Sequence, residues 1–284
     1  MKKMSKVFLT AVAAIMVMTT GLTAEAKSTL KGKITINGST ALLPLTQQAA
    51  KEFRTKNPGV TIAASGKGSV TGPQSVEKGI ADIGACDWDA STDVPGFKKF
   101  TGQVANKVAA IPFAAVVNNN VSVSNLTTQQ LKDIFSGKIK NWKEVGGQDG
   151  EIVIINRAFG SGTRVNFQMK ALENGDINKR DKNYKEVGSS GEMKTNVANT
   201  KNAIGFLDLV YVNSDLKALK INDVEASPAN VINGTYKVWS YGYYMTKGQP
   251  TGVTKAFIDY VQSSDFQQGS VKKMKFIPLN SIKK

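Results

Sequence analysis

Short apolar runs alternate along this chain with segments of helical periodicity. The run Ile152-Val153-Ile154-Ile155 predicts a strand covered on both faces, because four consecutive β-branched residues leave no polar face. After a glycine-containing turn, Val165, Met169 and Leu172 recur at i, i+4 and i+7, which predicts a helix that buries this face. A similar order of strand, turn and helix begins at Ile34. The alternation predicts an α/β fold built on open sheets.

The turns after the predicted strands are rich in serine, threonine and glycine. They comprise Asn37-Gly38-Ser39-Thr40, Ser65-Gly66-Lys67-Gly68-Ser69 and Gly160-Ser161-Gly162-Thr163. The unpaired N–H groups and the dipole of a helix start favour an anion at such a turn. Arg157, at the end of the central strand, adds a planar guanidinium suited to two oxygens of a tetrahedral oxyanion. One such turn is equally well explained as a helix cap and Arg157 as a surface charge, but the repetition favours an anion site.

A carboxylate follows another predicted strand. Asp87 comes directly after the apolar run that ends in Gly84-Ala85-Cys86, so it lies at the same sheet edge as the serine turns. Ligands of open α/β sheets bind at this edge, outside the carboxyl ends of the strands. The turn at Gly66-Lys67-Gly68-Ser69 lacks the G-x-x-x-x-G-K-[ST] pattern, which excludes a nucleotide-binding phosphate loop.

The first 26 residues have the pattern of an export signal. Lys2, Lys3 and Lys6 precede an apolar run at 7–18, and Ala24-Glu25-Ala26 forms a small-x-small cleavage site. We expect cleavage after Ala26 and a soluble periplasmic protein, because no later stretch approaches the length of a membrane-spanning helix.

The composition excludes several classes of function. The chain carries 37 Lys and Arg against 22 Asp and Glu, a net charge of +15, of which the signal contributes three lysines and one glutamate. The lysines are scattered and do not alternate with stacking aromatics, so we expect no nucleic-acid partner. The chain has no histidine and one cysteine, which excludes histidine-dependent triads, histidine-rich zinc sites and an internal disulfide. We therefore expect no catalytic residues, no metal and no cofactor.

Taken together, these residues resemble the phosphate-binding component of bacterial ABC transporters, within the two-lobed periplasmic binding proteins. The likeness spans nearly the whole mature chain and is most specific in Arg157 with Gly160-Ser161-Gly162-Thr163-Arg164 and in the segment 134–142. It implies a type II-like α/β fold in which each lobe is a mixed open sheet flanked by helices, with the ligand in the cleft between the lobes.

We place the lobe boundaries near Asn118-Asn119-Asn120, a polar segment suited to a crossover. Lobe I is then discontinuous and comprises residues 27–115 and 212–284. Lobe II comprises residues 116–211.

The resemblance also implies a dehydrated phosphate ion and its binding residues, which are Ser39, Thr40, Ala41, Ser69, Asp87, Arg157, Ser161, Gly162 and Thr163. Neutral donors and helix starts hold a buried dianion when every oxygen is satisfied. Asp87 then provides selectivity, because phosphate retains a proton that it can donate to a carboxylate, whereas sulfate does not.

The sequence departs from the family pattern beside the arginine. Many family members carry an acidic residue between the arginine and the glycine-serine run, where this chain has Ala158-Phe159. We therefore expect Arg157 to lack a local counter-charge, which makes the cleft more positive and the affinity more sensitive to salt.

The resulting expectation is a monomeric protein that captures phosphate by hinge closure and delivers it to a membrane permease, without catalysis. The nearest alternative is the same fold with another oxyanion, such as sulfate, molybdate or tungstate. A phosphatase with Asp87 as nucleophile is disfavoured by the absence of histidine and of an evident metal cluster. A basic surface protein whose serine turns are only helix caps is the third alternative.

Overall fold

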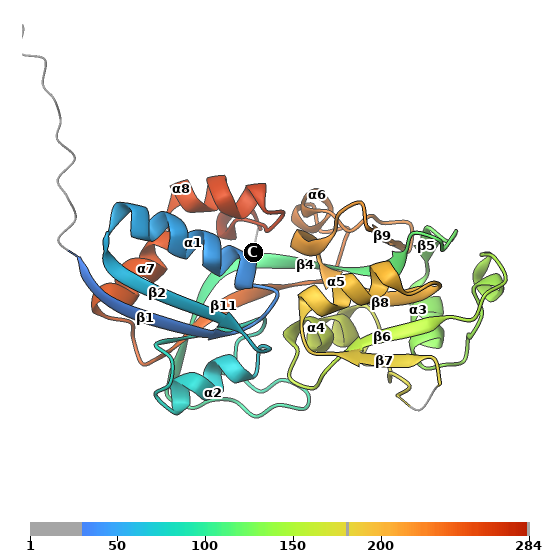
Figure 1. Cartoon of the computed structure of the whole chain (residues 1–284), viewed down its shortest axis with the longest axis horizontal. Coiled ribbons are helices and arrows are strands. Elements are labelled where there is room, and N and C mark those ends of the chain that lie inside the picture. The colour runs from blue at the N-terminus through green and yellow to red at the C-terminus, as the bar shows by residue number, and fades with distance from the viewer. Residues whose placement is uncertain (1–29, 180–181, 283–284) are drawn as a thin grey trace, which may run out of the picture.

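Two lobes lie side by side and are joined by the long strand β4 (Gln103–Asn118) and by the segment that leads into β11 (Trp239–Lys247) (Figure 1). The computed structural model of the protein describes residues 30–179 and 182–282. The predicted export signal at 1–26 lies outside these residues. No helix in the described part of the chain is long and apolar enough to cross a bilayer.

The first lobe contains a mixed sheet with a parallel core. Strand β1 (Lys31–Gly38) pairs in parallel with β2 (Gly59–Gly66) and with β3 (Ile83–Cys86), while β11 runs antiparallel to β3 and β4. The helices of this lobe are α1 (Leu43–Lys56), α2 (Thr71–Glu77), α7 (Gly252–Gln262) and α8 (Ser264–Phe266). A short π-helix, η3 (Gln267–Val271), and a 3-10 helix, η4 (Leu279–Ser281), complete the lobe. The carboxyl ends of β1, β2 and β3 therefore meet at one edge of the sheet.

The second lobe repeats this arrangement. Strand β6 (Val153–Arg157) pairs in parallel with β7 (Tyr184–Val187) and β8 (Ala203–Asp208). Its helices are α3 (Thr128–Phe135), α4 (Gly162–Lys170), α5 (Ser190–Asn199) and α6 (Pro228–Ile232). The remaining short elements are β5 (Asn125–Leu126), η1 (Trp142–Val145), η2 (Leu209–Tyr211), β9 (Leu216–Ala218) and β10 (Lys220–Ile221). The carboxyl ends of β6 and β8 face the first lobe.

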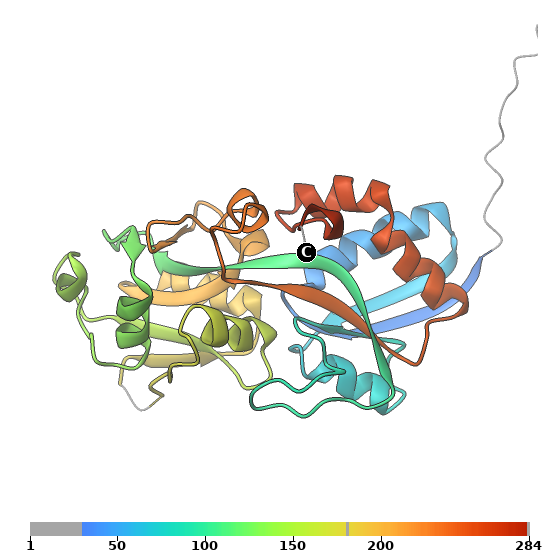
Figure 2. The same cartoon turned by 180° about the vertical axis from the view of Figure 1, so that it is seen from behind.

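Strand β4 belongs to both lobes, as the view from behind also shows (Figure 2). Its residues 103–112 pair with β11, and residues 113–117 pair with β8. Strand β9 then pairs with the end of β4, and β10 pairs with β5. The predicted boundaries, 27–115 with 212–284 and 116–211, stay a prediction, and these pairings favour a return to the first lobe close to Trp239.

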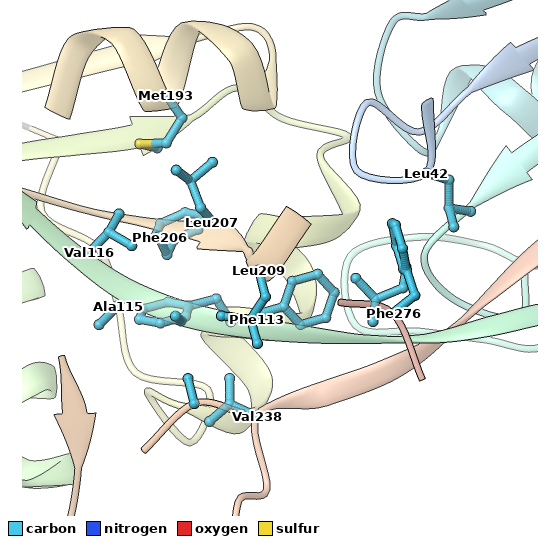
Figure 3. Packing of buried hydrophobic residues seen from close by; sticks show 14 of the residues in the cluster. Leu42, Phe113, Ala115, Val116, Met193, Phe206, Leu207, Leu209, Val238 and Phe276 are labelled. Atoms are coloured by element: carbon cyan, nitrogen blue, oxygen red, sulfur yellow. The ribbon is translucent and has the colours of Figure 1, made fainter. Parts of the chain in front are cut away.

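One continuous cluster of buried apolar side chains follows β4 through both lobes. Figure 3 shows Met193 and Val116 at the second-lobe end and Leu42 and Phe276 at the first-lobe end, with Phe113 between them. Burial of these groups stabilises the junction, and dense packing restricts how β4 bends. The shared core therefore keeps the facing sheet edges of the two lobes aligned with each other.

Two helix starts have clear local signals. A capping box of Thr127 and Gln130 starts α3, and Pro44 lies in the first turn of α1, where its missing N–H costs little.

One expectation about local structure is only partly met. Leu172 of the predicted helix face is buried, whereas Val165 and Met169 are only half-buried. Helix α4 buries Asn166 and Phe167 instead. Asn166 is buried because its side-chain amide donates to the Asp87 carbonyl of the first lobe at 2.8 Å, a contact that periodicity along the helix does not report.

Candidate anion site between the lobes

The structure brings the predicted site residues together in one buried region between the lobes. The first lobe contributes the turn after β1, at 39–41, together with Ser69 before α2 and Asp87 after β3. The second lobe contributes Arg157 at the end of β6 and residues 161–163 at the start of α4. All of these side chains are almost fully buried, so they form an interior site and not a surface patch.

The first-lobe turn begins at a position that requires glycine. Gly38 has φ +134°, and a Cβ there would lie 2.0 Å from the carbonyl oxygen of Ala85. The chain then turns so that the Ser39 hydroxyl accepts hydrogen bonds from the amides of Ala41 and Leu42, at 3.0 and 3.1 Å. Ser39 thus shapes the turn, and Thr40 is left pointing its hydroxyl at the second lobe.

The second-lobe turn depends on Gly162. A Cβ at this residue would lie 2.2 Å from the Ser69 hydroxyl oxygen and 2.5 Å from Oδ2 of Asp87, so any larger residue would push the lobes apart. Ser161 caps α4 by accepting a hydrogen bond from the amide of Arg164 at 3.3 Å. The N–H groups of the first helical turn have no intrahelical partner, and they lie where the first-lobe hydroxyl and carboxylate approach. The residues that cap α4 are therefore also the ones suited to bind an anion.

Direct hydrogen bonds join the lobes across this site. Arg157 Nη2 donates to Thr40 Oγ1 at 3.0 Å, and the Tyr211 hydroxyl donates to the Thr40 carbonyl at 2.8 Å. The Asn166 side-chain amide donates to the Asp87 carbonyl at 2.8 Å. Arg157 is only 1% exposed, so its alternative interpretation as a surface charge is wrong. The lobes are closed on each other, with Arg157 at the centre of the contact.

Asp87 is a buried carboxyl with an altered proton affinity. Burial raises its pKa to about 6, while the hydroxyls of Ser39 and Ser69 and the charge of Arg157 act in the opposite direction. Its Oδ1 atom accepts no hydrogen bond from the described residues. A carboxyl that exchanges its proton near neutral pH is suited to share a proton with a ligand oxygen.

Ser190 belongs to this site, although the sequence interpretation did not include it. Its hydroxyl accepts a hydrogen bond from Arg157 Nη1 at 3.1 Å and lies 3.1 Å from Thr40 Oγ1. The run Gly188-Ser189-Ser190-Gly191 is a further serine turn at a helix start. The strand before it, β7, has the sequence Tyr184-Lys185-Glu186-Val187, so no apolar run predicts a strand ahead of this turn.

The sequence interpretation also missed Asp208, at the end of β8. Burial lowers the pKa of Arg157, and the charges of Asp208 and then Asp87 oppose this effect most. Arg157 has no acidic residue in its own turn, but Asp208 and Asp87 supply carboxylates near it from the ends of two strands distant in sequence. The expected sensitivity of the affinity to salt stays a prediction.

Within the described ranges, no group of three or more His, Cys, Asp and Glu side chains is arranged to hold a metal ion. The chemistry that this region offers consists of hydroxyls, helix-start amides, one guanidinium and two carboxyls. Such a set has the donors that suit a small oxyanion.

Donors of this kind, contributed by two lobes that close on each other, define a solute-binding protein of the two-lobed class. The family model described as a PBP superfamily domain matches residues 23–265. The phosphate-binding protein PstS of Bacillus subtilis (strain 168) is 37% identical over 261 residues, which cover 92% of this chain and 85% of that protein. The chain therefore belongs to the PstS family of phosphate-binding proteins within the PBP superfamily.

Solved structures show the same relationship. A phosphate ABC transporter substrate-binding protein from Clostridium perfringens, solved with bound phosphate, superposes with a TM-score of 0.80 at 35% identity and covers 87% of this chain and 100% of that one. An ABC-type phosphate transport receptor from Vibrio cholerae has a TM-score of 0.66 at 28% identity, with 86% and 99% of the two chains covered. These matches agree with the predicted two-lobed α/β fold.

Proposed function

We propose that this protein captures inorganic phosphate between its lobes and delivers it to the membrane permease of an ABC transporter. The observation that carries the proposal is the buried Arg157, which meets Thr40 across the lobe boundary beside the start of α4. The names of the relatives support phosphate as the anion, because the Bacillus subtilis protein is a phosphate-binding protein and the Clostridium perfringens structure contains phosphate.

Phosphate binding replaces the direct contacts between the lobes with contacts through the ion. Arg157 offers two N–H groups, which now donate to Ser190 and Thr40, and these hydroxyls are free to turn toward an oxyanion. The first amides of α4, at Gly162 and Thr163, add neutral donors and the positive end of the helix dipole. We assign the remaining ligand positions to Ser39, Ala41, Ser69, Asp87 and Ser161.

Closure of the lobes follows from the division of these donors. Thr40, Ser69 and Asp87 belong to the first lobe, whereas Arg157 and the start of α4 belong to the second. Only the closed form satisfies all oxygens of a dehydrated dianion at once, so phosphate stabilises that form. The lobes are connected by β4 and by the segment that leads into β11, so the small bend that closure needs falls in these two connections.

Asp87 gives the site its preference for phosphate. A phosphate oxygen that still carries a proton donates it to this carboxylate, whereas sulfate presents only acceptors and is repelled. The same site without this discrimination would suit sulfate, molybdate or tungstate, which is the alternative function. We infer that no catalytic step, metal or cofactor is involved.

The proposal extends to the cellular context. The export signal at 1–26, with cleavage after Ala26, directs the chain to the periplasm, where it acts as a monomer. Its large positive charge attracts phosphate from a distance, which increases the rate of encounter.

The test measures thermal stability and binding enthalpy of the phosphate-stripped protein with phosphate, sulfate, molybdate and tungstate. A ligand present at 100 times its dissociation constant stabilises the folded protein by about 2.7 kcal/mol. We expect this effect with phosphate alone. Stabilisation by a different oxyanion would mean that the protein binds that anion and not phosphate. No stabilisation by any anion would overturn the proposal.

Arg157→Lys tests the site itself. Breaking a buried, hydrogen-bonded charge contact costs about 2–5 kcal/mol, so phosphate affinity falls by roughly 30-fold or more. Arg54→Lys, at an exposed position of α1, is the matched control and leaves the affinity unchanged. Equal phosphate affinity of both variants would show that Arg157 does not bind phosphate.

A further inference from the structure

Asp208 is a buried carboxyl whose oxygens have no hydrogen-bond partner. The side chain is 1% exposed, and neither Oδ1 nor Oδ2 accepts a hydrogen bond from any described residue. A buried carboxylate normally obtains several donors, because leaving it unpaired in a low-dielectric interior is costly. Even the exposed carboxylate of Asp82 accepts a backbone hydrogen bond, at 2.7 Å, whereas the buried Asp208 does not.

The charged and titratable groups around Asp208 come from four other elements. Arg157 of β6 attracts its carboxylate, and Asp87 after β3 repels it. The Tyr211 side chain of η2 interacts with its charge, and the Ser190 hydroxyl of α5 makes the weakest contribution. Arg157 forms no ion pair with Asp208, since its Nη1 and Nη2 groups donate to Ser190, Thr40 and the Gly188 carbonyl. Asp208 is thus near a positive charge but not neutralised by it.

The sum of charges in this region disfavours a dianion. Two ionised carboxylates and one guanidinium leave a net charge of −1 before any ligand enters. A doubly charged phosphate brings the net charge to −3 in a water-excluded site, where repulsion between like charges is strong. One proton on a carboxyl relieves more of this repulsion than any rearrangement of neutral hydroxyls.

Asp208 is the carboxyl best placed to accept that proton. Asp87 has the Ser39 and Ser69 hydroxyls beside it, which favour its ionised form and leave it able to accept a proton from phosphate. Asp208 is accompanied by one hydroxyl, that of Ser190, whose effect on its pKa is the weakest of the surrounding groups, and neither of its carboxylate oxygens has a hydrogen-bond partner among the described residues.

We propose that Asp208 takes up a proton when phosphate enters the site, so that phosphate capture is coupled to proton binding. The inference rests on the proposed function. In agreement with it, burial raises the pKa of Asp208 to about 7, and the charge of Asp87 raises it further, while Arg157 opposes both effects. Phosphate adds negative charge beside this carboxyl and raises its pKa again. Capture is then favoured on the acidic side of neutrality.

The test measures phosphate binding by calorimetry at several pH values, in buffers of different ionisation enthalpy, for the wild type and Asp208→Asn. Phosphate itself titrates near neutral pH, so each comparison is made between the two proteins at one pH, where the ligand contributes equally. With a pKa of about 7, we expect equal affinities at pH 6 and about tenfold tighter binding by the variant at pH 8. The wild type also takes up more protons per phosphate than the variant does.

Asp176→Asn serves as the control, because Asp176 is an exposed carboxylate and its removal changes the net charge equally. Its affinity and proton count match the wild type at each pH. If Asp208→Asn does not fold, carbon-13 NMR of aspartate-labelled wild type replaces it. A buried carboxyl that stays protonated to higher pH with phosphate than without it supports the proposal, and no such carboxyl overturns it.

The outcomes separate the two proposals. If the wild type binds no phosphate at pH 6 or 8, the proposed function and the proton coupling both fall. If it binds phosphate but Asp208→Asn shows the same proton uptake and the same affinity ratio at every pH, only the coupling is wrong. A variant that binds more weakly by one constant factor at all pH values assigns Asp208 a positioning role and also contradicts the coupling.

Discussion

The Phe159 ring of the second lobe lies stacked on the Phe97 ring of the first, with centroids 4.8 Å apart and an interplanar angle of 22°. Phe97 packs in turn on Trp88, at 5.0 Å between centroids. Phe159 is 69% exposed, and its aromatic contact among the described residues is this stack with Phe97. Because Phe159 lies in the turn that links Arg157 to Gly160, the stack forms at the rim of the anion site.

We expect Phe159→Ala to weaken phosphate binding by favouring the open form. An aromatic pair contributes about 0.5–1.5 kcal/mol beyond its buried area, which corresponds to roughly a two- to tenfold loss of affinity. Calorimetric titration measures the change. Ile232→Ala is the control, because this residue is also a partly exposed apolar side chain but lies in α6, outside the stack. Equal affinity of both variants and the wild type would mean that the stack does not stabilise closure.

Asp87→Asn is expected to reduce discrimination between phosphate and sulfate. The amide places N–H donors where the carboxylate repelled an unprotonated anion, so sulfate binding improves while phosphate loses an acceptor for its proton. Competition of sulfate against phosphate, followed by calorimetry, measures the ratio of affinities. We expect this ratio to move toward sulfate by roughly tenfold or more, since a lost charge-assisted hydrogen bond costs about 1.5–3 kcal/mol. An unchanged ratio would remove Asp87 from the selectivity mechanism.

Ser190→Ala tests a residue that only the structure brought into the site. Ser190 is fully buried, and its hydroxyl contacts both Arg157 and Thr40. Its loss leaves one guanidinium N–H without an acceptor and frees the side chain to move, so phosphate affinity falls by roughly tenfold. Ser214→Ala, at an exposed position, is the matched control. An affinity equal to that of the control would place Ser190 outside the functional set.

The parts of the fold that were predictable have strong local signals. Apolar runs marked β1, β3 and β6, and glycine-serine turns marked the starts of the helices that follow β1 and β6. These turns converge on one site because the carboxyl ends of parallel strands share an edge, which is a property of the fold class.

The missed residues have no such local signal. Asp208 ends an apolar strand and reads as an ordinary boundary residue, because its proximity to Arg157 arises only from the pairing of β6 with β8. The stack of Phe97 on Phe159 joins two loops from different lobes. These side chains meet only after distant strands and loops have come together. Hydrophobic periodicity along a single element therefore cannot predict their contacts.

The stability of the phosphate-free protein is expected to respond to pH through Asp87 and Asp208. Burial raises the folded-state pKa values of these carboxyls to about 6 and about 7, above the value of 3.8 that each has when exposed. Between pH 4 and 7 the folded state therefore holds more protons than the unfolded state. Their contribution is fully present below about pH 4 and is lost as the pH rises through the folded pKa values. These two groups thus make the free energy of unfolding decrease with rising pH over this range.

Asp208→Asn isolates this effect from other carboxylates, such as Asp149, whose lowered pKa acts in the opposite direction. The variant keeps a neutral side chain of similar shape, so its free energy of unfolding equals or falls slightly below that of the wild type at pH 4.5. At pH 8 the wild type must hold an unpaired buried charge and the variant does not, so the variant becomes the more stable protein. Urea unfolding at both pH values, with phosphate removed, measures the difference, and Asp176→Asn shows no such reversal. A constant difference between wild type and Asp208→Asn at the two pH values would mean that Asp208 does not titrate in this range.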